Sequence, residues 1–107
     1  MTQNFKEKIP YDYFLNLLKD ICLYENNSYL FDNDLFKKLK FHNQLDNIIN
    51  EIKIYYKNSK QHYIFNAYNY KGFITLLRQI SKFLNIKYEK KIKYINSGYT
   101  IKYHFFI

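Results

Sequence analysis

The pattern of apolar and polar residues predicts a helix near the N-terminus. Pro10 suits the first turn of a helix, and Asp12 lies close to the positive end of its dipole. Apolar residues then recur every three or four positions, with polar residues on the opposite side. These apolar residues are Tyr11, Phe14, Leu15, Leu18, Ile21 and Cys22. The polar run 25–28 is expected to end the helix, and residues 29–31 to form a short extended segment.

Two further helices are predicted before residue 57. Asp32 or Asp34 can cap a helix that reaches about Leu39. Asn43 can cap the next one, whose apolar stripe consists of Leu45, Ile48, Ile49, Ile52 and Tyr55 or Tyr56. The polar run 57–60 is typical of a loop, and residues 62–65 are expected to be extended.

The strongest amphipathic pattern predicts a fourth helix that begins after Asn69. Its apolar face contains Phe73, Leu76, Leu77, Ile80, Phe83 and Leu84. Its polar face contains Lys71, Thr75, Arg78, Gln79 and Lys82.

Residues 86–107 alternate between apolar and polar with a period of two, and residues 96–98 are turn formers, so this stretch predicts a β-hairpin. We expect Asn96 to pair with Tyr99, because a three-residue loop would mix the two faces. This register places Tyr94 opposite Ile101, Ile92 opposite Tyr103, Lys93 opposite Lys102, and Lys91 opposite His104. Three lysines and a histidine then share the outward face.

Together these elements predict one α+β domain over residues 1–107, with three or four helices followed by a C-terminal antiparallel hairpin packed on the fourth helix. A chain of 107 residues, 48% hydrophobic, suits a single core. No apolar run is long enough to span a bilayer, and the single Cys22 cannot form an internal disulfide. We therefore expect an intracellular protein, in the cytoplasm, nucleus or virion, that neither enters a membrane nor is secreted.

The net charge of +8 is unevenly distributed. Residues 1–52 carry six lysines against eight acids, whereas residues 53–107 carry ten lysines and Arg78 against Glu89 alone. Residues 1–57 are thus a mainly helical, near-neutral to acidic part, and residues 58–107 a basic part. A/T-rich codons, typical of many viral genomes, explain the abundance of Lys, Asn and Tyr but not this separation. Such asymmetry favours a polyanion as the partner of the basic part.

Phosphates would relieve the repulsion between clustered lysines, and their binding would release counterions. Arg and Gln side chains read base edges, whereas Lys mainly contacts phosphate. We therefore predict a small basic protein that binds nucleic acid, duplex DNA more than RNA, without catalytic residues, cofactor or metal. The predicted interface consists of Lys71, Thr75, Arg78, Gln79, Lys82, Lys91, Lys93, Lys102 and His104. A solvated basic face is the alternative.

The stretch from Asn69 to Phe83, NYKGFITLLRQISKF, resembles the recognition helix of winged-helix DNA-binding domains. Phe73 and the Arg78-Gln79-Ile80 triplet resemble the heat-shock-factor branch, and the hairpin 86–107 takes the place of the wing. In such families the helix enters the major groove and the wing touches the DNA backbone. The resemblance implies base contacts for Arg78 and phosphate contacts for Lys91, Lys93 and Lys102. It covers the last third of the chain. The helix 43–56 and the segment around Ile64 are extra to a minimal winged helix, and the hairpin is long and poor in glycine.

Enzymatic alternatives rest on few residues. Cys22 lies in an apolar stripe, which favours an inert thiol, and the three histidines share no metal-ligand spacing. Asp46 with Glu51-Ile52-Lys53 resembles the acid and Glu-x-Lys pattern of metal-dependent nucleases, although periodicity places these residues on a helix.

Two non-enzymatic alternatives also remain. Surface tyrosines can stack on unpaired bases, although most tyrosines here share stripes with Ile and Leu and are expected in the core. A protein-interaction or virion-type structural module is the other alternative, with a homodimer formed through the N-terminal helices.

Overall fold

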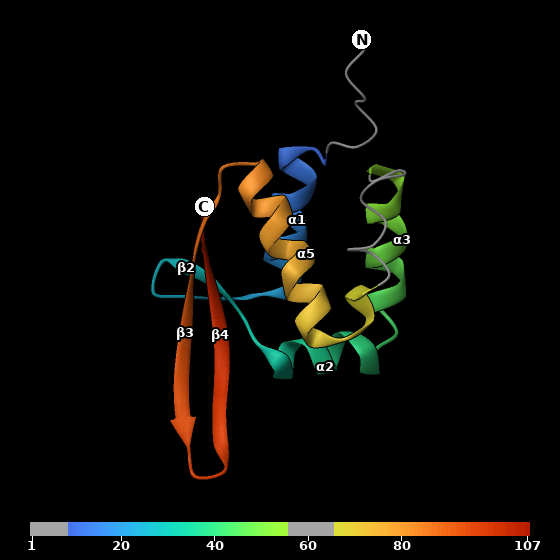
Figure 1. Cartoon of the computed structure of the whole chain (residues 1–107). Coiled ribbons are helices and arrows are strands. Elements are labelled where there is room, and N and C mark those ends of the chain that lie inside the picture. The colour runs from blue at the N-terminus through green and yellow to red at the C-terminus, as the bar shows by residue number, and fades with distance from the viewer. Residues whose placement is uncertain (1–8, 56–65) are drawn as a thin grey trace.

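The computed structural model describes residues 9–55 and 66–107. The first range contains α1 (Tyr11–Ile21), β1 (Leu23–Glu25), β2 (Ser28–Phe31), α2 (Asn33–Phe41) and α3 (Leu45–Tyr55). The second contains the 3₁₀ helix η3 (Asn66–Tyr68), α5 (Tyr70–Phe83), β3 (Lys87–Ile95) and β4 (Gly98–Phe106). The predicted α+β class, the four helices and the C-terminal hairpin are confirmed (Figure 1). The predicted loop 57–60 and extended segment 62–65 lie outside the described residues.

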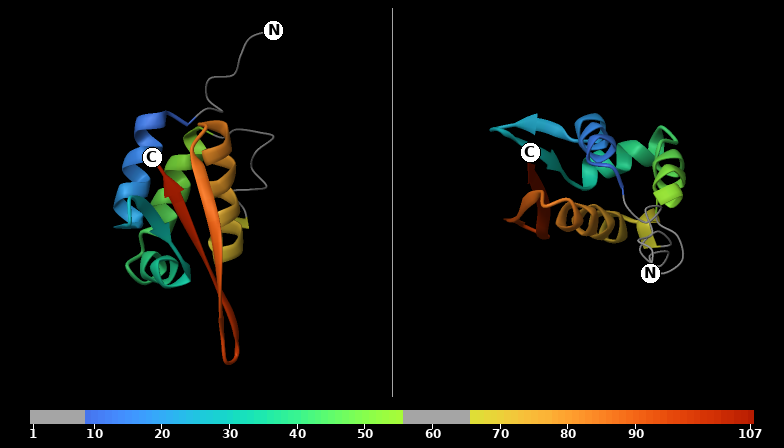
Figure 2. Two further views of the ribbon diagram at one scale, coloured as in Figure 1. Left: turned by 90° about the vertical axis from the view of Figure 1, so that its left-hand side faces the viewer. Right: turned by 90° about the horizontal axis from the view of Figure 1, so that it is seen from above.

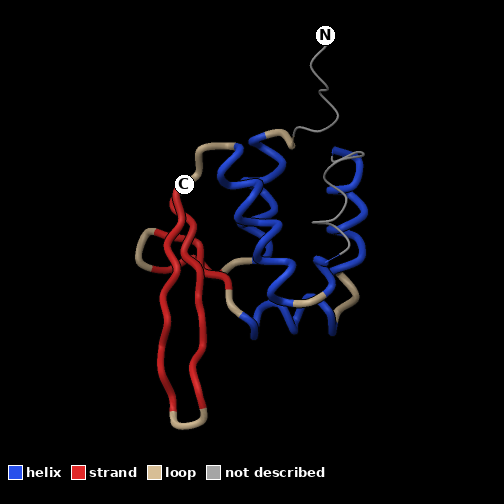
Figure 3. Tube along the Cα trace, in the orientation of Figure 1, coloured by secondary structure: helices blue, strands red, loops and turns tan. Residues whose placement is uncertain are grey.

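The four strands form one antiparallel sheet in the order β1-β2-β4-β3, shown in red in Figure 3. Only one short extended segment, residues 29–31, was expected in the first half of the chain, whereas the structure has a β1–β2 hairpin there. Its turn is formed by Asn26 and Asn27, both left-handed with φ of 51° and 64°. Two left-handed residues define the type of two-residue turn that matches the twist of paired strands. Through β2, this small hairpin joins the C-terminal one.

The predicted register of the C-terminal hairpin is wrong by two residues. Ile95 pairs with Gly98, Tyr94 with Tyr99 and Ile92 with Ile101. The turn is therefore Asn96-Ser97, and Gly98 follows it with a φ of 147°, a conformation that favours glycine. A relative shift of two residues preserves the side-chain alternation, so the residues predicted to share a face still do.

Two of the helices, α2 and α5, begin at side-chain caps. Asn69 Oδ1 accepts from the Gly72 N–H at 2.8 Å, as expected. Asp32, and not Asp34, caps α2 by accepting from the Leu35 N–H at 3.0 Å. Asn43 does not cap α3. It lies in the left-handed region (φ 58°) after α2, where short polar side chains are tolerated, and Gln44 precedes α3.

The core lies between the helices and one face of the sheet. Its fully buried side chains include Phe14, Leu18, Phe31, Ile49, Ile52, Phe73, Leu76, Leu77, Ile80 and Phe105. Tyr11 and Phe83, expected on apolar stripes, are exposed, and each is the terminal residue of its helix. Burial of this apolar surface is the main term that stabilises the fold.

The C-terminal hairpin extends well past the helices (Figures 1 and 2). The molecule measures 53 × 27 × 22 Å along its principal axes, and every residue from 89 to 100 is exposed. Pairing of β2 with β4 ends at Phe31 opposite Tyr103, so the distal part of the hairpin is a two-stranded ribbon.

The face assignment of β4 predicts different costs for two adjacent phenylalanines. Phe105 is 0% exposed and Phe106 is 38% exposed. We expect Phe105→Ala to lower the free energy of unfolding by about 3–5 kcal/mol. The matched Phe106→Ala variant should lose about 1 kcal/mol or less. Urea denaturation followed by circular dichroism measures both, and equal losses would contradict the face assignment.

Candidate nucleic-acid interface

The predicted residues of α5 lie along its outer side. Their spacing of three and four places them on one helical face, opposite the buried residues. Lys71 and Lys82 are exposed, and Thr75, Arg78 and Gln79 are partly exposed between them. The Thr75 hydroxyl donates to the Lys71 carbonyl at 2.9 Å. The structure therefore brings these five side chains together as the sequence predicted.

Arg78 connects α5 to the hairpin. Its Nε donates to the Tyr88 hydroxyl at 3.4 Å, and its Cζ lies 5.7 Å from the ring centroids of both Tyr88 and Tyr103. The hydrogen bond with Tyr88 is the main influence that raises the pKa of the Arg78 guanidinium. Such cation–π contacts are favourable, more so when the cation is partly shielded from water. Arg78 thus fixes β3 and β4 against the helix.

The two faces of the hairpin differ in chemistry. One face continues the core-facing side of the sheet outward with Tyr88, Lys90, Ile92, Tyr94, Tyr99, Ile101 and Tyr103. The reverse face carries Lys87, Glu89, Lys91, Lys93, Thr100, Lys102 and His104. Lys91 lies directly opposite Lys102, and Lys93 opposite Thr100. A lysine cluster on the outward face is therefore present, with different partners from those predicted.

His104 lies at the end of that face nearest to β2. It was expected opposite Lys91, but it pairs with Glu89 on one side and Leu30 on the other. Its Nδ1 is 3.0 Å from Ser28 Oγ, which itself donates to the Glu25 carbonyl at 3.2 Å. Ser28 is buried and has one hydroxyl proton, so it accepts from a protonated Nδ1. His104 therefore helps to join β4 to β2.

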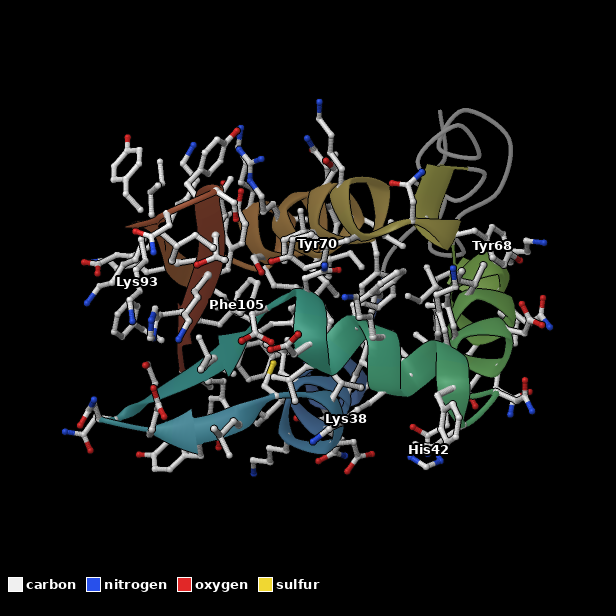
Figure 4. All side chains as sticks on the ribbon, turned by 90° about the horizontal axis from the view of Figure 1, so that it is seen from below. Lys38, His42, Tyr68, Tyr70, Lys93 and Phe105 are labelled. Carbon is white, nitrogen blue, oxygen red and sulfur yellow. The ribbon has the colours of Figure 1, made fainter. Side chains whose placement is uncertain are left out.

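A groove of about 880 Å³ lies where α2, α5 and the hairpin meet. Its lining includes three of the predicted residues, Lys71, Lys93 and Lys102, together with Lys37 of α2 and two acids, Asp32 and Asp34. Figure 4 shows Tyr70 between α5 and α2, and its hydroxyl donates to the Ile101 carbonyl at 3.1 Å. Sequence reasoning missed Lys37, because only the packing of α2 beside the hairpin brings it close.

The residues considered for catalysis are not assembled into a site. Asp46, Glu51 and Lys53 lie on α3, as the periodicity predicted, and Glu51 accepts a 2.8 Å hydrogen bond from the Tyr13 hydroxyl. Burial raises the pKa of the Cys22 thiol to about 12, which opposes formation of the nucleophilic thiolate. Among residues 9–55 and 66–107, no group of three or more His, Cys, Asp or Glu is arranged to hold a metal ion.

The apolar stripes of α1 and α3 are used inside the domain. Phe14, Leu18, Ile49 and Ile52 are all buried in the core. Within Tyr11–Ile21 and Leu45–Tyr55, Tyr11 and Ile54 are the large apolar side chains left exposed. The predicted homodimer through these helices gains no support from their packing.

The chain matches no protein-family model, and searches of curated proteins and of solved structures gave no match. In the described part of the chain, none of the helices has the length and apolar character needed to cross a membrane.

Removing the guanidinium of Arg78 should loosen the hairpin. We expect Arg78→Met, which keeps most of the apolar stem, to lower the free energy of unfolding by about 1–2 kcal/mol. The matched Lys82→Met variant, on the exposed side of the same helix, should change it by about 0.5 kcal/mol or less. Urea denaturation measures the free energy of unfolding of both variants. If Arg78→Met loses no more stability than Lys82→Met, the contact of Arg78 with Tyr88 and Tyr103 does not stabilise the hairpin.

The Cys22 thiol should make stability fall at high pH. Its pKa is raised above the ordinary 9.0 to about 12, so above pH 9 the unfolded chain loses the proton while the folded chain keeps it. The free energy of unfolding should therefore fall with pH above 9, by at most about 1.4 kcal/mol per unit from this group. Burial also raises the pKa of Tyr13 and Tyr70, which adds to the fall above pH 10.

Urea titrations at pH 8, 9 and 10 test this, with Cys22→Ala as the control. The variant should lose less stability than the parent chain between pH 9 and 10. If the free energy of unfolding depends on pH identically in both proteins, the Cys22 thiol is not held protonated by burial.

Proposed function

We propose that this chain is a small, basic, non-enzymatic nucleic-acid-binding protein that contacts duplex DNA through α5 and the β3–β4 hairpin. The observation that carries the proposal is the placement of a helix with an outward cationic stripe beside a projecting lysine-rich ribbon (Figure 1). Residues 66–107 carry eight cationic side chains against the single acid Glu89. Neutralisation of phosphates by such cations supplies most of the affinity of non-specific DNA binding.

The shapes of the two elements suit a duplex. The major groove of B-DNA admits either an α-helix or a two-stranded β-ribbon. Lys71 and Lys82 are eleven residues apart on α5, or about 16 Å along its axis at 1.5 Å per residue. That span covers several phosphates of one duplex. A winged-helix-like docking, with α5 in the groove and the hairpin along the backbone, is the arrangement that we propose.

In this arrangement the predicted residues would contact either the DNA backbone or the base edges. Lys71, Lys82, Lys91, Lys93 and Lys102 would contact phosphates, and Thr75 and Gln79 would face base edges. Arg78 would add positive charge where α5 meets the hairpin while it braces the two elements. His104 would lie at the inner end of the lysine face.

Some acidic side chains lie away from this surface, whereas Asp32 and Asp34 line the groove beside the hairpin. Asp20 and Glu51 line a separate groove of about 500 Å³ between α1 and α3. In Figure 1, α3 lies on the opposite side of the helical body from the hairpin. This separation favours one orientation of the protein toward a polyanion.

Binding should be measured by fluorescence anisotropy with a labelled duplex at several salt concentrations. We expect micromolar or tighter binding at low salt, falling steeply as salt rises. Lys91→Gln/Lys93→Gln should weaken binding about tenfold and reduce the slope of log K against log salt by about two, because each lost phosphate contact lowers it by about 0.9. The control Lys19→Gln/Lys53→Gln removes the same charge from α1 and α3.

A larger loss in the control than in the hairpin variant would contradict the proposed surface. An absence of binding by the parent chain at low salt would refute the proposed function and leave the charge as a solvated face.

A further inference from the structure

The distal part of the hairpin exposes an aromatic pair. Tyr94 and Tyr99 lie directly opposite each other on β3 and β4, with ring centroids 6.1 Å apart. Tyr94 is 77% exposed and Tyr99 58% exposed, and Ile92 on the same face is 43% exposed. Cross-strand aromatic pairs stabilise a ribbon, but a pair this exposed leaves much of its ring surface in water.

Most other aromatic rings near the sheet are covered. Tyr103 and Phe105 on the same face are buried, and Tyr88 and Tyr103 lie against Arg78. The β1–β2 hairpin also has a cross-strand pair, Tyr24 and Tyr29, but Tyr29 packs against the core. Codon composition explains how many tyrosines the chain has, and it does not explain why two face solvent at the end of a projecting ribbon.

Most charged groups around the pair are cationic, and the two acids Asp32 and Asp34 of α2 line the groove that Tyr99 borders. Lys90 shares its face, while Lys91, Lys93 and Lys102 lie on the reverse face of the same short ribbon. Glu89 is the hairpin's sole acid. An exposed π surface flanked by lysines matches the chemistry of an unpaired nucleic-acid strand, whose bases stack on aromatic rings while its phosphates meet cations.

A lipid surface is a poorer match for this face. Lys90 lies between Tyr88 and Ile92 on the aromatic face, so insertion of that face into a bilayer would bring an ammonium group with it. The same ammonium group is well placed for a phosphate of a strand that stacks on the tyrosines.

We propose that Tyr94 and Tyr99, with Ile92 beside them, form a stacking site for unpaired bases of a single-stranded nucleic acid. The inference rests on the proposed function, because the lysines of the hairpin supply the phosphate contacts. Tyr94, the more exposed ring, takes the first base. The rings are tilted by 57°, so Tyr99 meets a base through its edge or supports Tyr94. The site then adds affinity for DNA or RNA with unpaired bases to the binding that the lysines provide.

The test compares three labelled probes in anisotropy titrations: a mixed-sequence 12-nucleotide DNA, the same sequence as RNA, and the DNA as a duplex. Tyr94→Leu/Tyr99→Leu keeps apolar area and removes the π faces. We expect it to weaken binding of the single strands about tenfold or more, and binding of the duplex by less than about twofold. Tyr94→Phe/Tyr99→Phe should keep single-strand binding, because the ring is retained. Tyr24→Leu removes an equally exposed ring (58%) from the other hairpin and should have no effect.

Several outcomes would overturn the inference. If the parent chain binds duplex and the leucine variant leaves single-strand binding unchanged, the stacking site is refuted while the proposed function stands. Equal losses on duplex and single strand would also refute it, since they would reveal a general defect of the hairpin. If no probe binds at low salt, both proposals fail. Binding to vesicles of phosphatidylcholine and phosphatidylglycerol, without single-strand binding, would assign the aromatic face to lipid. Circular dichroism and urea denaturation establish that each variant is folded.

Discussion

The pairing of β2 with β4 is the interaction on which the rest of the structure depends. It joins residues such as Tyr29 and Phe105, which are far apart in the sequence, and merges two hairpins into one four-stranded sheet. An isolated two-stranded hairpin is marginally stable in water. The merged sheet gives α5 a broad apolar face to cover, with Phe31, Tyr103 and Phe105 on that side. The Ser28–His104 contact reinforces the same junction from the reverse side.

The lysine-rich ribbon exists only because this junction anchors its base. Beyond Phe31 the sheet has two strands, and there Lys91 faces Lys102 directly, an arrangement that opposes folding. Exposed tyrosines add apolar surface that folding does not bury. The ribbon therefore has two unfavourable features, the repulsion between Lys91 and Lys102 and the ring surface that stays in water. A polyanion that binds there would offset both. Departures from locally favourable choices often mark functional sites.

Much of this architecture follows from local pattern in the sequence. The 3.6-residue period of α1 and α5, the cap at Asn69 and the two-residue alternation of the last strands each depend on neighbours within a few positions. The charge separation is likewise visible without a structure, and it brought Lys71, Lys82 and the hairpin lysines into the candidate interface.

The features that the sequence did not reveal depend on distant contacts or on small differences in turn geometry. The Asn26-Asn27 turn lacks glycine, the usual mark of a tight hairpin, so β1 was missed. The hairpin register was misjudged because shifts of two residues leave the faces unchanged. The contact of Arg78 with Tyr88 and Tyr103, and the approach of Lys37 to the hairpin, required the packed structure.

Backbone NMR most directly tests the claim that α5 and the hairpin form the nucleic-acid surface. A ¹⁵N-labelled sample would be titrated with a short DNA duplex at low salt, and amide shift changes mapped on the chain. We expect changes concentrated in residues 70–83 and 87–106, with α1 and α3 little affected. Changes centred on α1 and α3, or spread evenly over the chain, would contradict it.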